Sequence, residues 1–376
     1  MANLEKLKTL IPLYLLEQGA QQQIYNALAL DFLLKLAVMA DCHTGYTLPI
    51  GGVALLDSVI SPEYVGYDIG CGMCYIELDL HVDDIFRTKK ERVRFFNKIY
   101  EKIPVSFESR KKGLFYYKFP NASGNKDLYN KVRDRLYVQL GTLGGGNHFI
   151  EIGQNRKHNV TITLHSGSRN MGHSIASYYM KASKLGDPDL PQGFLHLNGE
   201  LGQQYVADMN FALEYALANR KSMMEEILGL MGFNKQQTDA IIKQKMVNEN
   251  HNHAIILDNN QVLHRKGATP AEKGQIGIIP GNMRDGVYVT EGLGNEEYLC
   301  SSSHGAGRKL GRKQAKKQLD IHRFEKQMTN VVAKVGKSTL DESPDAYKKL
   351  AEVIKMQEDI VIKTIDHSAP IINVKG

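Results

Sequence analysis

The chemically reactive side chains of this chain are spread over most of its 376 residues rather than gathered in one segment. They lie in short polar or glycine-rich strings that recur from Asp41 to Gly307, and we find no tandem repeat, low-complexity segment or clear linker between them. Domain boundaries normally fall in such linkers. The sequence therefore predicts one α+β domain over residues 1–376, with a site assembled from remote parts of the chain.

The composition, 42% hydrophobic and 23% charged, is typical of a soluble globular protein with a substantial core. A net charge of +6 is compatible with a polyanionic partner but does not require one. Four cysteines are too few for a disulfide framework at this length, which predicts a reducing, cytoplasmic compartment. No stretch approaches the roughly 20 apolar residues of a spanning helix, so we expect no membrane segment.

Glycine-rich turns and hydrophobic periodicity indicate both strands and helices. Strands are expected over 51–56, 64–80, 159–168, 274–281 and 286–292. Helices are expected over 21–36, 82–103, 203–232, 307–319 and 343–365. The stretch 111–127 has the composition of a loop.

The string DIGCGM places Asp68 and Cys71 three residues apart, with glycine on both sides of the cysteine. A carboxylate and a thiolate are both metal ligands, and the glycines would let the backbone bend until both face one ion. The alternative is a buried structural cysteine. Cys74 completes a C-x-x-C, but no second C-x-x-C exists for a zinc knuckle, and residues three apart in a strand point to opposite faces. We therefore assign Cys74 to packing.

Three glycines precede Asn147 and His148 in the string GTLGGGNHFIEIG. In an extended segment Asn147, Phe149 and Glu151 would share one face, while His148 points to the other. One face would then offer polar groups to a ligand and the other a histidine to a metal. The glycines would also let an anion or a nucleotide approach the backbone. The alternative is a plain glycine-rich hairpin turn.

Two further strings carry histidine near expected strand ends. In TLHSGSRNMGH, His165 ends an apolar strand, and residues 166–169 would cradle a phosphate at the start of a helix. The alternative there is a capped helix with a buried histidine. NENHNHAII carries His251 and His253, which would share a face in a strand, whereas in a turn only one would point inward. The nearby His-Arg-Lys step at 264–266 suits a phosphate.

Taken singly, each of these histidines is more often a structural residue than a ligand. As a set, Asp68, Cys71, His148, His165 and His251 all lie in polar settings rich in glycine or asparagine. Mixed oxygen, sulfur and nitrogen donors suit a transition metal such as Mn²⁺ or Zn²⁺, and two ions would suit phosphoryl transfer. Two nucleotide motifs are excluded, because VGKST lacks the earlier glycine of a P-loop and HGAGRKLG lacks the third glycine of the dinucleotide spacing.

Taken together, nine strings resemble the RtcB family of RNA-splicing ligases, in the family's order and over nearly the whole chain. They are ADCHTGYTLPIGGV, DIGCGM, GTLGGGNHFIEI, LHSGSR, NHN, HRKGAT, IPGNM, SSSHGAGR and VKG. The resemblance implies a single α+β domain with mixed sheets around a central site for two manganese ions. It also implies GTP-dependent joining of an RNA 2′,3′-cyclic phosphate or 3′-phosphate end to a 5′-hydroxyl end.

The resemblance further implies roles for particular residues. His304 in HGAGR would attack the α-phosphate of GTP to form histidine–GMP, which passes GMP to the RNA 3′-phosphate before the 5′-hydroxyl displaces it. The implied metal ligands are Asp68, Cys71 (shared by both ions), His148, His165 and His251, with Asp41 supporting them. The implied GTP contacts are Asn147, His148, Phe149, Ile150, Glu151, His251, Asn252, Pro280, Gly281, Asn282, Met283, His304, Gly305, Ala306, Gly307, Tyr347 and Lys375.

The chain departs from the family pattern in several places. It is shorter than the commonest members, so some peripheral RNA-contacting elements are expected to be missing. PGNMRDGV has Asn282, Arg284 and Val287 where the family has PGSMG and a nearby serine, which would remove a hydroxyl contact to GTP and add a cation. A compact branch of the family is associated with repair of cleaved ribosomal or transfer RNA beside a release-factor-like partner. We therefore favour repair over tRNA splicing, and an archease-like activator is another expected partner.

Two other functions would use the same residues. A metal-dependent RNA phosphoesterase would need no GTP, but it has no use for a nucleophile set in HGAGR. A non-catalytic RNA-binding protein would be expected to have lost a ligand or the nucleophile, and every matched one is present. After His304, the cations Arg308, Lys309, Arg312 and Lys313 open a basic helix that we expect to face the RNA backbone. Arg308 would clamp pyrophosphate, bind RNA or cap the site.

Overall fold

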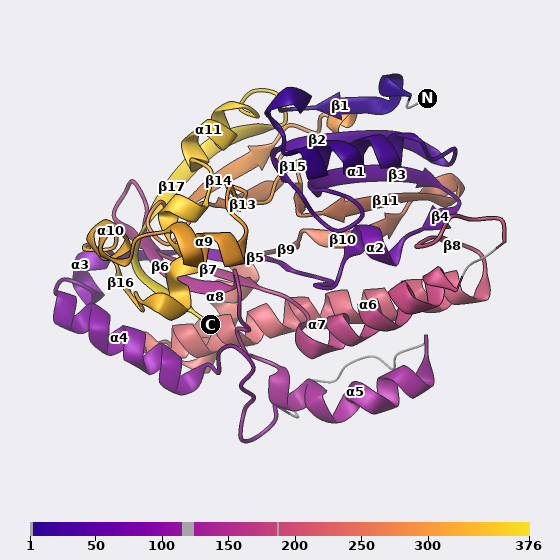
Figure 1. Ribbon diagram of the computed structural model, residues 1–376. Coiled ribbons are helices and arrows are strands. Elements are labelled where there is room, and N and C mark those ends of the chain that lie inside the picture. Colours follow the sequence, from indigo (N-terminus) through magenta and orange to yellow (C-terminus); the bar gives the residue numbers. More distant parts are fainter. Residues whose placement is uncertain (1–2, 115–123, 186–187) are drawn as a thin grey trace.

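Two mixed sheets form the centre of the molecule, and helices cover their outer sides (Figure 1). The computed structural model describes residues 3–114, 124–185 and 188–376. The first sheet has five strands, parallel between the first two and antiparallel between the others. In spatial order they are β1 (Leu7–Thr9), β2 (Leu33–His43), β3 (Ile50–Asp57), β11 (Gln261–Lys266) and β10 (Asn252–Ile256). The predicted α+β class with mixed sheets is confirmed.

The second sheet has eight strands and draws on most of the chain. Its main path runs β13 (Ile276–Pro280), β14 (Val287–Gly292), β17 (Ile362–Lys375), β6 (Phe149–Gln154), β7 (Asn159–Ser166), β5 (Gly72–His81) and β9 (Val247–Asn250). One more strand, β16 (Val332–Ala333), pairs in parallel with β17. Two small pairs are β12 (Ala268–Pro270) with β15 (Ser301–Ser303) and β4 (Val59–Ile60) with β8 (Leu195–His196). Because β17 lies between β14 and β6, the last strand in the sequence joins the two halves of this sheet.

The helix α7 (Glu200–Leu230) packs against the eight-stranded sheet, with α6 (Arg169–Lys184) alongside it (Figure 1). Its Met223 and Ile227 share one apolar core with sheet residues such as Ile162. The other helices are α1 (Gln18–Leu28), α2 (Pro62–Val65), α3 (Val82–Ile85), α4 (Lys89–Lys102), α5 (Lys126–Gln139), α8 (Lys235–Lys245), α9 (Arg312–Gln318), α10 (Ile321–Gln327) and α11 (Leu350–Lys355). Across the described residues, none of the helices has the length and apolar character needed to cross a membrane.

Two expected helices have different limits in the structure. The helix expected over 21–36 ends at Leu28, because the apolar residues that follow pair with β3 as strand β2. The helix expected over 82–103 is divided into α3 and α4. Thr88 starts α4 through a capping box, in which its hydroxyl accepts the backbone N–H of Glu91 and the Glu91 carboxylate accepts that of Thr88.

The helix expected over 343–365 is mostly wrong. Only a 3-10 turn at Pro344–Ala346 and α11 are helical within it, and the chain from Ile362 onward is strand β17. Pairing with β14 and β6 buries Ile372 and Val374 completely, and this tertiary gain overrides the helical period of the sequence. The basic helix expected over 307–319 is likewise limited to α9.

The strand expected over 64–80 is present only from Gly72, as β5. Gly66 and Gly70 adopt left-handed backbone angles, with φ of 93° and 73°, and turn the chain before the strand begins. This turn carries Asp68 and brings it to the end of the sheet. The expected loop 111–127 lies partly outside the described residues.

Strand register aligns several site segments at one end of the eight-stranded sheet. Gly72 of β5 lies opposite both Ser166 of β7 and Asn250 of β9, and Phe149 of β6 lies opposite His165 of β7. The residues that directly precede or follow these pairs include Cys71, His148 and His251. Segments separated by up to 180 residues therefore meet at this edge because of how the strands pair.

Candidate active site

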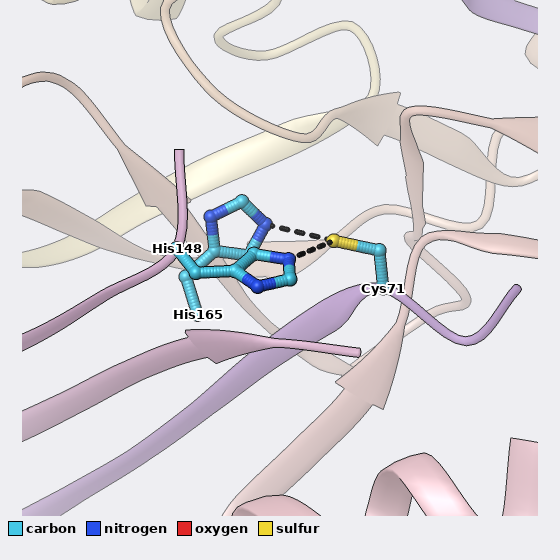
Figure 2. A group of neighbouring side chains, drawn as sticks. All are labelled: Cys71, His148 and His165. Carbon is cyan, nitrogen blue, oxygen red and sulfur yellow. Dashed lines mark hydrogen bonds between the residues drawn. The ribbon is translucent and has the colours of Figure 1, made fainter. Parts of the chain in front are cut away.

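Cys71 faces two imidazoles at this end of the sheet. Figure 2 shows its sulfur facing the rings of His148 and His165, with Cys71 Sγ 3.5 Å from His148 Nε2 and 3.2 Å from His165 Nε2. Asp68 Oδ2 is 3.0 Å from His148 Nε2, and His251 Nε2 is 3.3 Å from His165 Nε2. The five predicted metal ligands thus form one row, in the order Asp68, His148, Cys71, His165 and His251, which we call the ligand row.

Backbone carbonyls orient two rings of the ligand row. His148 Nδ1 is 3.1 Å from the carbonyl oxygen of Leu143, and His165 Nδ1 is 3.2 Å from that of Asn147. Since a carbonyl only accepts, each Nδ1 carries the proton and each Nε2 presents a lone pair. Two imidazole lone pairs, a sulfur and a carboxylate oxygen therefore converge. A divalent transition metal would satisfy these acceptors, so the residues fit such an ion.

Burial disfavours charge on most of the ligand row. It raises the pKa of the Cys71 thiol well above its ordinary value, and Asp68 adds to that rise. It lowers the pKa of His165 and His251 well below the ordinary value. Burial raises the pKa of Asp68, but the contacts of Asp68 with His148 and other residues have a larger effect and lower this pKa to about 2. The imidazoles of His165 and His251 are thus neutral, which is the form that binds a metal.

His304 lies beside the ligand row and has a buried carboxylate behind it. Its ring centroid is 4.8 Å from that of His251. Asp41 Oδ2 is 2.7 Å from His304 Nδ1, at an angle outside that of a hydrogen bond, and accepts the backbone N–H groups of His304 and Gly305 at 3.2 Å each. The structure thus places Asp41, expected as a support of the metal site, directly beside His304. With Asp41 at Nδ1, Nε2 is the nitrogen left for chemistry.

A cavity of about 300 Å³, the first cavity, opens beside His304. This volume is at the lower end for small-molecule sites. It is lined by thirteen of the residues predicted to contact GTP: Asn147, Phe149, Glu151, Pro280, Gly281, Asn282, Met283, His304, Gly305, Ala306, Gly307, Tyr347 and Lys375. Strand alternation in β6 turns Phe149 and Glu151 towards the cavity, while the side chain of Ile150 is fully buried in the core and does not line it.

Three other predicted GTP contacts lie elsewhere. His148 and His251 belong to the ligand row, and Asn252 borders a second cavity, of about 370 Å³. The second cavity is also lined by His304 and by Asp68 of the ligand row. His304 therefore stands between the two cavities.

Two buried acceptors face the first cavity without a donor. Glu151 Oε2 accepts from Asn373 Nδ2 at 3.0 Å, but Glu151 Oε1 and Asn373 Oδ1 have no hydrogen-bond partner among the described residues. Burial raises the pKa of Glu151 to about 8, although Asn373 and Lys375 act in the opposite direction. A ligand edge with N–H donors would satisfy both acceptors.

Glu342 is a central residue of the first cavity that the sequence reasoning missed. Its carboxylate accepts from Arg308 Nη1 at 3.1 Å, Arg312 Nη1 at 2.7 Å, Tyr347 Oη at 2.7 Å and Lys375 Nζ at 2.5 Å. Burial raises its pKa, but Lys375 and Arg312 lead a larger opposite effect that lowers it to about 2. Arg308 and Arg312 are thus tied to the cavity wall. Other lining residues that were missed are His43, Ile50, Gly286 and Asn373.

The expected phosphate cradle after β7 is not formed by its hydroxyls. Ser166 and Ser168 both donate to backbone carbonyls and so keep their hydroxyls bonded within the protein. Of the alternative, a capped helix with a buried histidine, His165 is buried, but the Ser168 side chain makes no cap hydrogen bond to α6. His251 and His253 do not act as a pair: His251 joins the ligand row, whereas His253 Nε2 is 3.4 Å from Arg265 Nη1. The step 264–266 is buried and bonded within the protein rather than open to a phosphate.

A family model described as tRNA-splicing ligase RtcB matches residues 23–118 and 119–376. The chain belongs to the RtcB family. It is 31% identical over 394 residues to the RNA-splicing ligase RtcB of Escherichia coli K12, covering 96% of this chain and 95% of that protein. It is 29% identical over 443 residues to the tRNA-splicing ligase RtcB of Nanoarchaeum equitans, covering 94% and 91%. The predicted RtcB resemblance is confirmed.

All predicted site residues, from Asp41 to Lys375, lie within the range of the RtcB match. The alignment with the Thermococcus kodakarensis tRNA-splicing ligase RtcB extends over 433 residues at 28% identity, although this chain has only 376. Such an alignment must contain gaps on the side of this chain. This chain is therefore a compact RtcB protein that keeps the segments of the ligand row and of both cavities.

Proposed function

We propose that this protein is an RNA ligase that uses GTP and two Mn²⁺ ions to join a 3′-phosphate or 2′,3′-cyclic phosphate end to a 5′-hydroxyl end. The position of His304 carries the proposal: one imidazole lines both cavities, with the ligand row beside it and a carboxylate behind it. Relatives named as RNA-splicing and tRNA-splicing ligases support RNA as the substrate. A phosphoesterase would have no need of the first cavity.

Guanine is the base that fits the donor-free acceptors of the first cavity. Glu151 Oε1 and Asn373 Oδ1 both need a donor, and the Watson–Crick edge of guanine supplies N1–H and the N2 amino group. Adenine would present an acceptor at N1 instead. Lys375, which already donates to Glu342 and to the carbonyl of Asn147, has a donor to offer guanine O6. These groups favour GTP over ATP.

The ligand row would hold the two manganese ions. Its contacts connect Cys71 to both His148 and His165, with Asp68 next to His148 and His251 next to His165. A thiolate in this position would bridge the two ions. When bound, the ions supply positive charge that neutralises phosphate oxygens and assists the departure of pyrophosphate.

The protein's own residues account for the group transfers. His304 Nε2 attacks the α-phosphorus of GTP, a P–N bond forms, the bond to the β-phosphate oxygen breaks, and pyrophosphate leaves. Asp41 holds Nδ1 and stabilises the cationic ring in this step. An oxygen of the RNA 3′-phosphate then attacks the same phosphorus and releases neutral histidine. The 5′-hydroxyl finally attacks the 3′-phosphate and GMP leaves; a cyclic end must first add water.

We place this activity in RNA repair or tRNA splicing in the cytoplasm, and we favour repair because the chain is compact. Candidate partners are an archease-like activator and a release-factor-like protein, and no membrane partner is expected.

The test is ligation of a defined RNA pair, one strand ending in a 2′,3′-cyclic phosphate and the other starting with a 5′-hydroxyl. With Mn²⁺, we expect joining with GTP and little with ATP or with no nucleotide. [α-³²P]GTP should label the wild type through an acid-labile, base-stable bond, and the label should be absent from His304→Ala. Equal labelling of both proteins would overturn the role of His304. End processing without GTP would favour the phosphoesterase.

A further inference from the structure

The second cavity opens to the surface beside two tyrosines. Tyr46 lies in the loop between β2 and β3 and is 72% exposed, and Tyr67 follows α2 and is 37% exposed. Their ring centroids are 5.5 Å apart at an interplanar angle of 73°. Tyr67 also stacks on His173 of α6, at 5.2 Å and 24°, where α2 packs against α6 (Figure 1). We call Tyr46, Tyr67 and His173 the aromatic mouth.

The backbone that carries Tyr46 is fixed, although its ring is exposed. Thr44 Oγ1 donates to Glu17 Oε2 at 2.6 Å, and the Gly45 N–H donates to Gln23 Oε1 at 3.0 Å. The Gln23 amide donates in turn to the carbonyl of Tyr46. A ring that is mostly exposed contributes little to folding by burial. A large aromatic face on a preorganised loop is instead the arrangement expected of a binding surface, because little conformational entropy is lost when a ligand binds.

The second cavity requires an occupant that is flat at its opening and anionic at its inner end. Its inner residues are His304 and the ligand-row residues Asp68, Cys71 and His251. Among the described residues that line it, Asp68 is the only carboxylate, and metal binding would engage that group. A single-stranded nucleotide with a terminal phosphate has both properties. Its base has a face that stacks on aromatic rings, and its phosphate is attracted to metal ions.

We propose that Tyr46, supported edge-on by Tyr67 and by His173 behind it, stacks on the base of the nucleotide that carries the RNA 3′-phosphate. The stacked base positions that phosphate in the second cavity beside His304. This inference rests on the proposed ligase function. The 3′ end is assigned here because it, and not the 5′-hydroxyl end, brings a terminal phosphate to the ligand row. Stacking is tolerant of sequence, because every base has an aromatic face.

The test compares Tyr46→Ala with the wild type in ligation at varied concentrations of the 3′-phosphate strand. Rates are normalised to the fraction of each protein that takes a GMP label, so that only folded molecules are counted. We expect the KM for this strand to rise roughly 5- to 150-fold, the range that corresponds to ~1–3 kcal/mol per stacked base. Tyr46→Phe keeps the ring and should restore the KM. Tyr14→Ala is the matched control, because Tyr14 is 80% exposed and does not line either cavity.

A strand whose last nucleotide lacks its base makes the test specific. In the wild type, removing the base should weaken binding by the same factor as Tyr46→Ala weakens binding of the intact strand. Tyr46→Ala should bind the strands with and without the last base equally well. If both proteins lose equally, or if Tyr46→Ala matches Tyr14→Ala, the inference is wrong. An effect seen only in the presence of a protein activator would also overturn it.

A failure of the ligase proposal would be recognised separately. Fluorescence anisotropy of a labelled 3′-phosphate strand measures binding without GTP and without joining. The ligase function fails if the wild type neither takes the GMP label nor ligates. The stacking inference still holds in that case if the wild type binds this strand more tightly than Tyr46→Ala does, and if the two proteins bind the strand without the last base equally. Equal binding of the strand by both proteins would contradict the stacking itself.

Discussion

Asp41 Oδ2 lies 2.7 Å from His304 Nδ1, although the two residues are 263 positions apart in the sequence. Burial raises the pKa of Asp41, but its interactions with His304, His43 and Lys348 outweigh this effect and lower it below the ordinary value. The carboxylate is therefore ionised at neutral pH. It also accepts the backbone N–H groups of His304 and Gly305, so one side chain fixes both the ring and the loop of the nucleophile.

Replacing Asp41 should therefore slow the first step without removing the nucleophile. For Asp41→Asn we expect the rate of GMP labelling to fall about 10²-fold, the cost typical of a reacting group displaced by about 1 Å. Single-turnover labelling with [α-³²P]GTP measures this rate. The exposed Asp31→Asn is the control. A labelling rate for Asp41→Asn equal to that of the wild type would show that Asp41 does not orient His304.

The order of the ligand row predicts how many manganese ions each variant keeps. Cys71 is central, so Cys71→Ala should lose both ions, whereas His251→Ala and Asp68→Ala, at opposite ends, should each keep one. Mass spectrometry of the metal content after dialysis against Mn²⁺ gives the count. Cys74→Ala is the control, because Cys74 is buried in the core and outside the row. Two ions retained in Cys71→Ala would exclude a bridging thiolate.

Glu151 should set both the choice of base and the pH dependence of GTP binding. In Glu151→Gln the KM for GTP should rise roughly 10- to 150-fold, since hydrogen bonds to charged groups are worth ~1.5–3 kcal/mol. The preference for GTP over ATP should fall with it. Because the pKa of Glu151 is about 8 and guanine needs the ionised acceptor, wild-type affinity for GTP should rise with pH up to about 8. Calorimetric titration at several pH values measures this slope.

The same raised pKa has the opposite effect on folding. A carboxyl whose pKa is higher in the folded state stabilises the fold fully below its unfolded pKa, and this contribution is lost as pH rises to about 8. Affinity for GTP and stability should thus change in opposite directions over this pH range. Glu151→Gln should show neither change, and a pH slope of GTP affinity retained in that variant would mean that another group titrates.

Removing the charge of Glu342 should destabilise the protein. Glu342→Gln leaves Lys375 and Arg308 without their buried carboxylate, whereas Arg312 keeps Asp341, and breaking a buried ion pair from one side costs about 3–5 kcal/mol. Urea unfolding at pH 7 measures the loss, and the exposed Glu352→Gln is the control. Because the pKa of Glu342 is lowered to about 2, its contribution is full above its unfolded pKa and is lost as pH falls. The difference between the two proteins should therefore narrow from pH 5 towards pH 2.

Much of the candidate site could be predicted because its residues lie in local patterns. The alternation after the three glycines predicted which side chains of residues 147–151 would face a ligand, and Phe149 and Glu151 do face the first cavity. The same alternation buries the side chain of Ile150, which the resemblance implied as a GTP contact, in the core. Because successive side chains of a strand point to opposite faces, the residues that share a face can be read from the sequence whenever the strand is correctly recognised.

Other features could not be predicted, because they depend on contacts between remote segments. Glu342 has no motif around it, and its importance arises only when Arg308, Arg312 and Lys375 converge on it. The first residues of strand β17, 362–365, were expected to be helical as the end of the helix predicted over 343–365; in the structure, β14 and β6, on either side, determine the conformation of this strand. His251 lies between β9 and β10, whereas His253 lies within β10, so the two side chains have different surroundings.

The central place of β17 has a consequence for the synthesis of the protein. The strands β13 and β14 are joined to the rest of their sheet through β17, and Lys375 reaches back 228 residues to contact Asn147. The first cavity therefore cannot close until residue 375 has left the ribosome. A nascent chain already carries His304 and the whole ligand row before the first cavity is complete. Under the proposed function, unfinished copies of the protein would be unable to bind GTP.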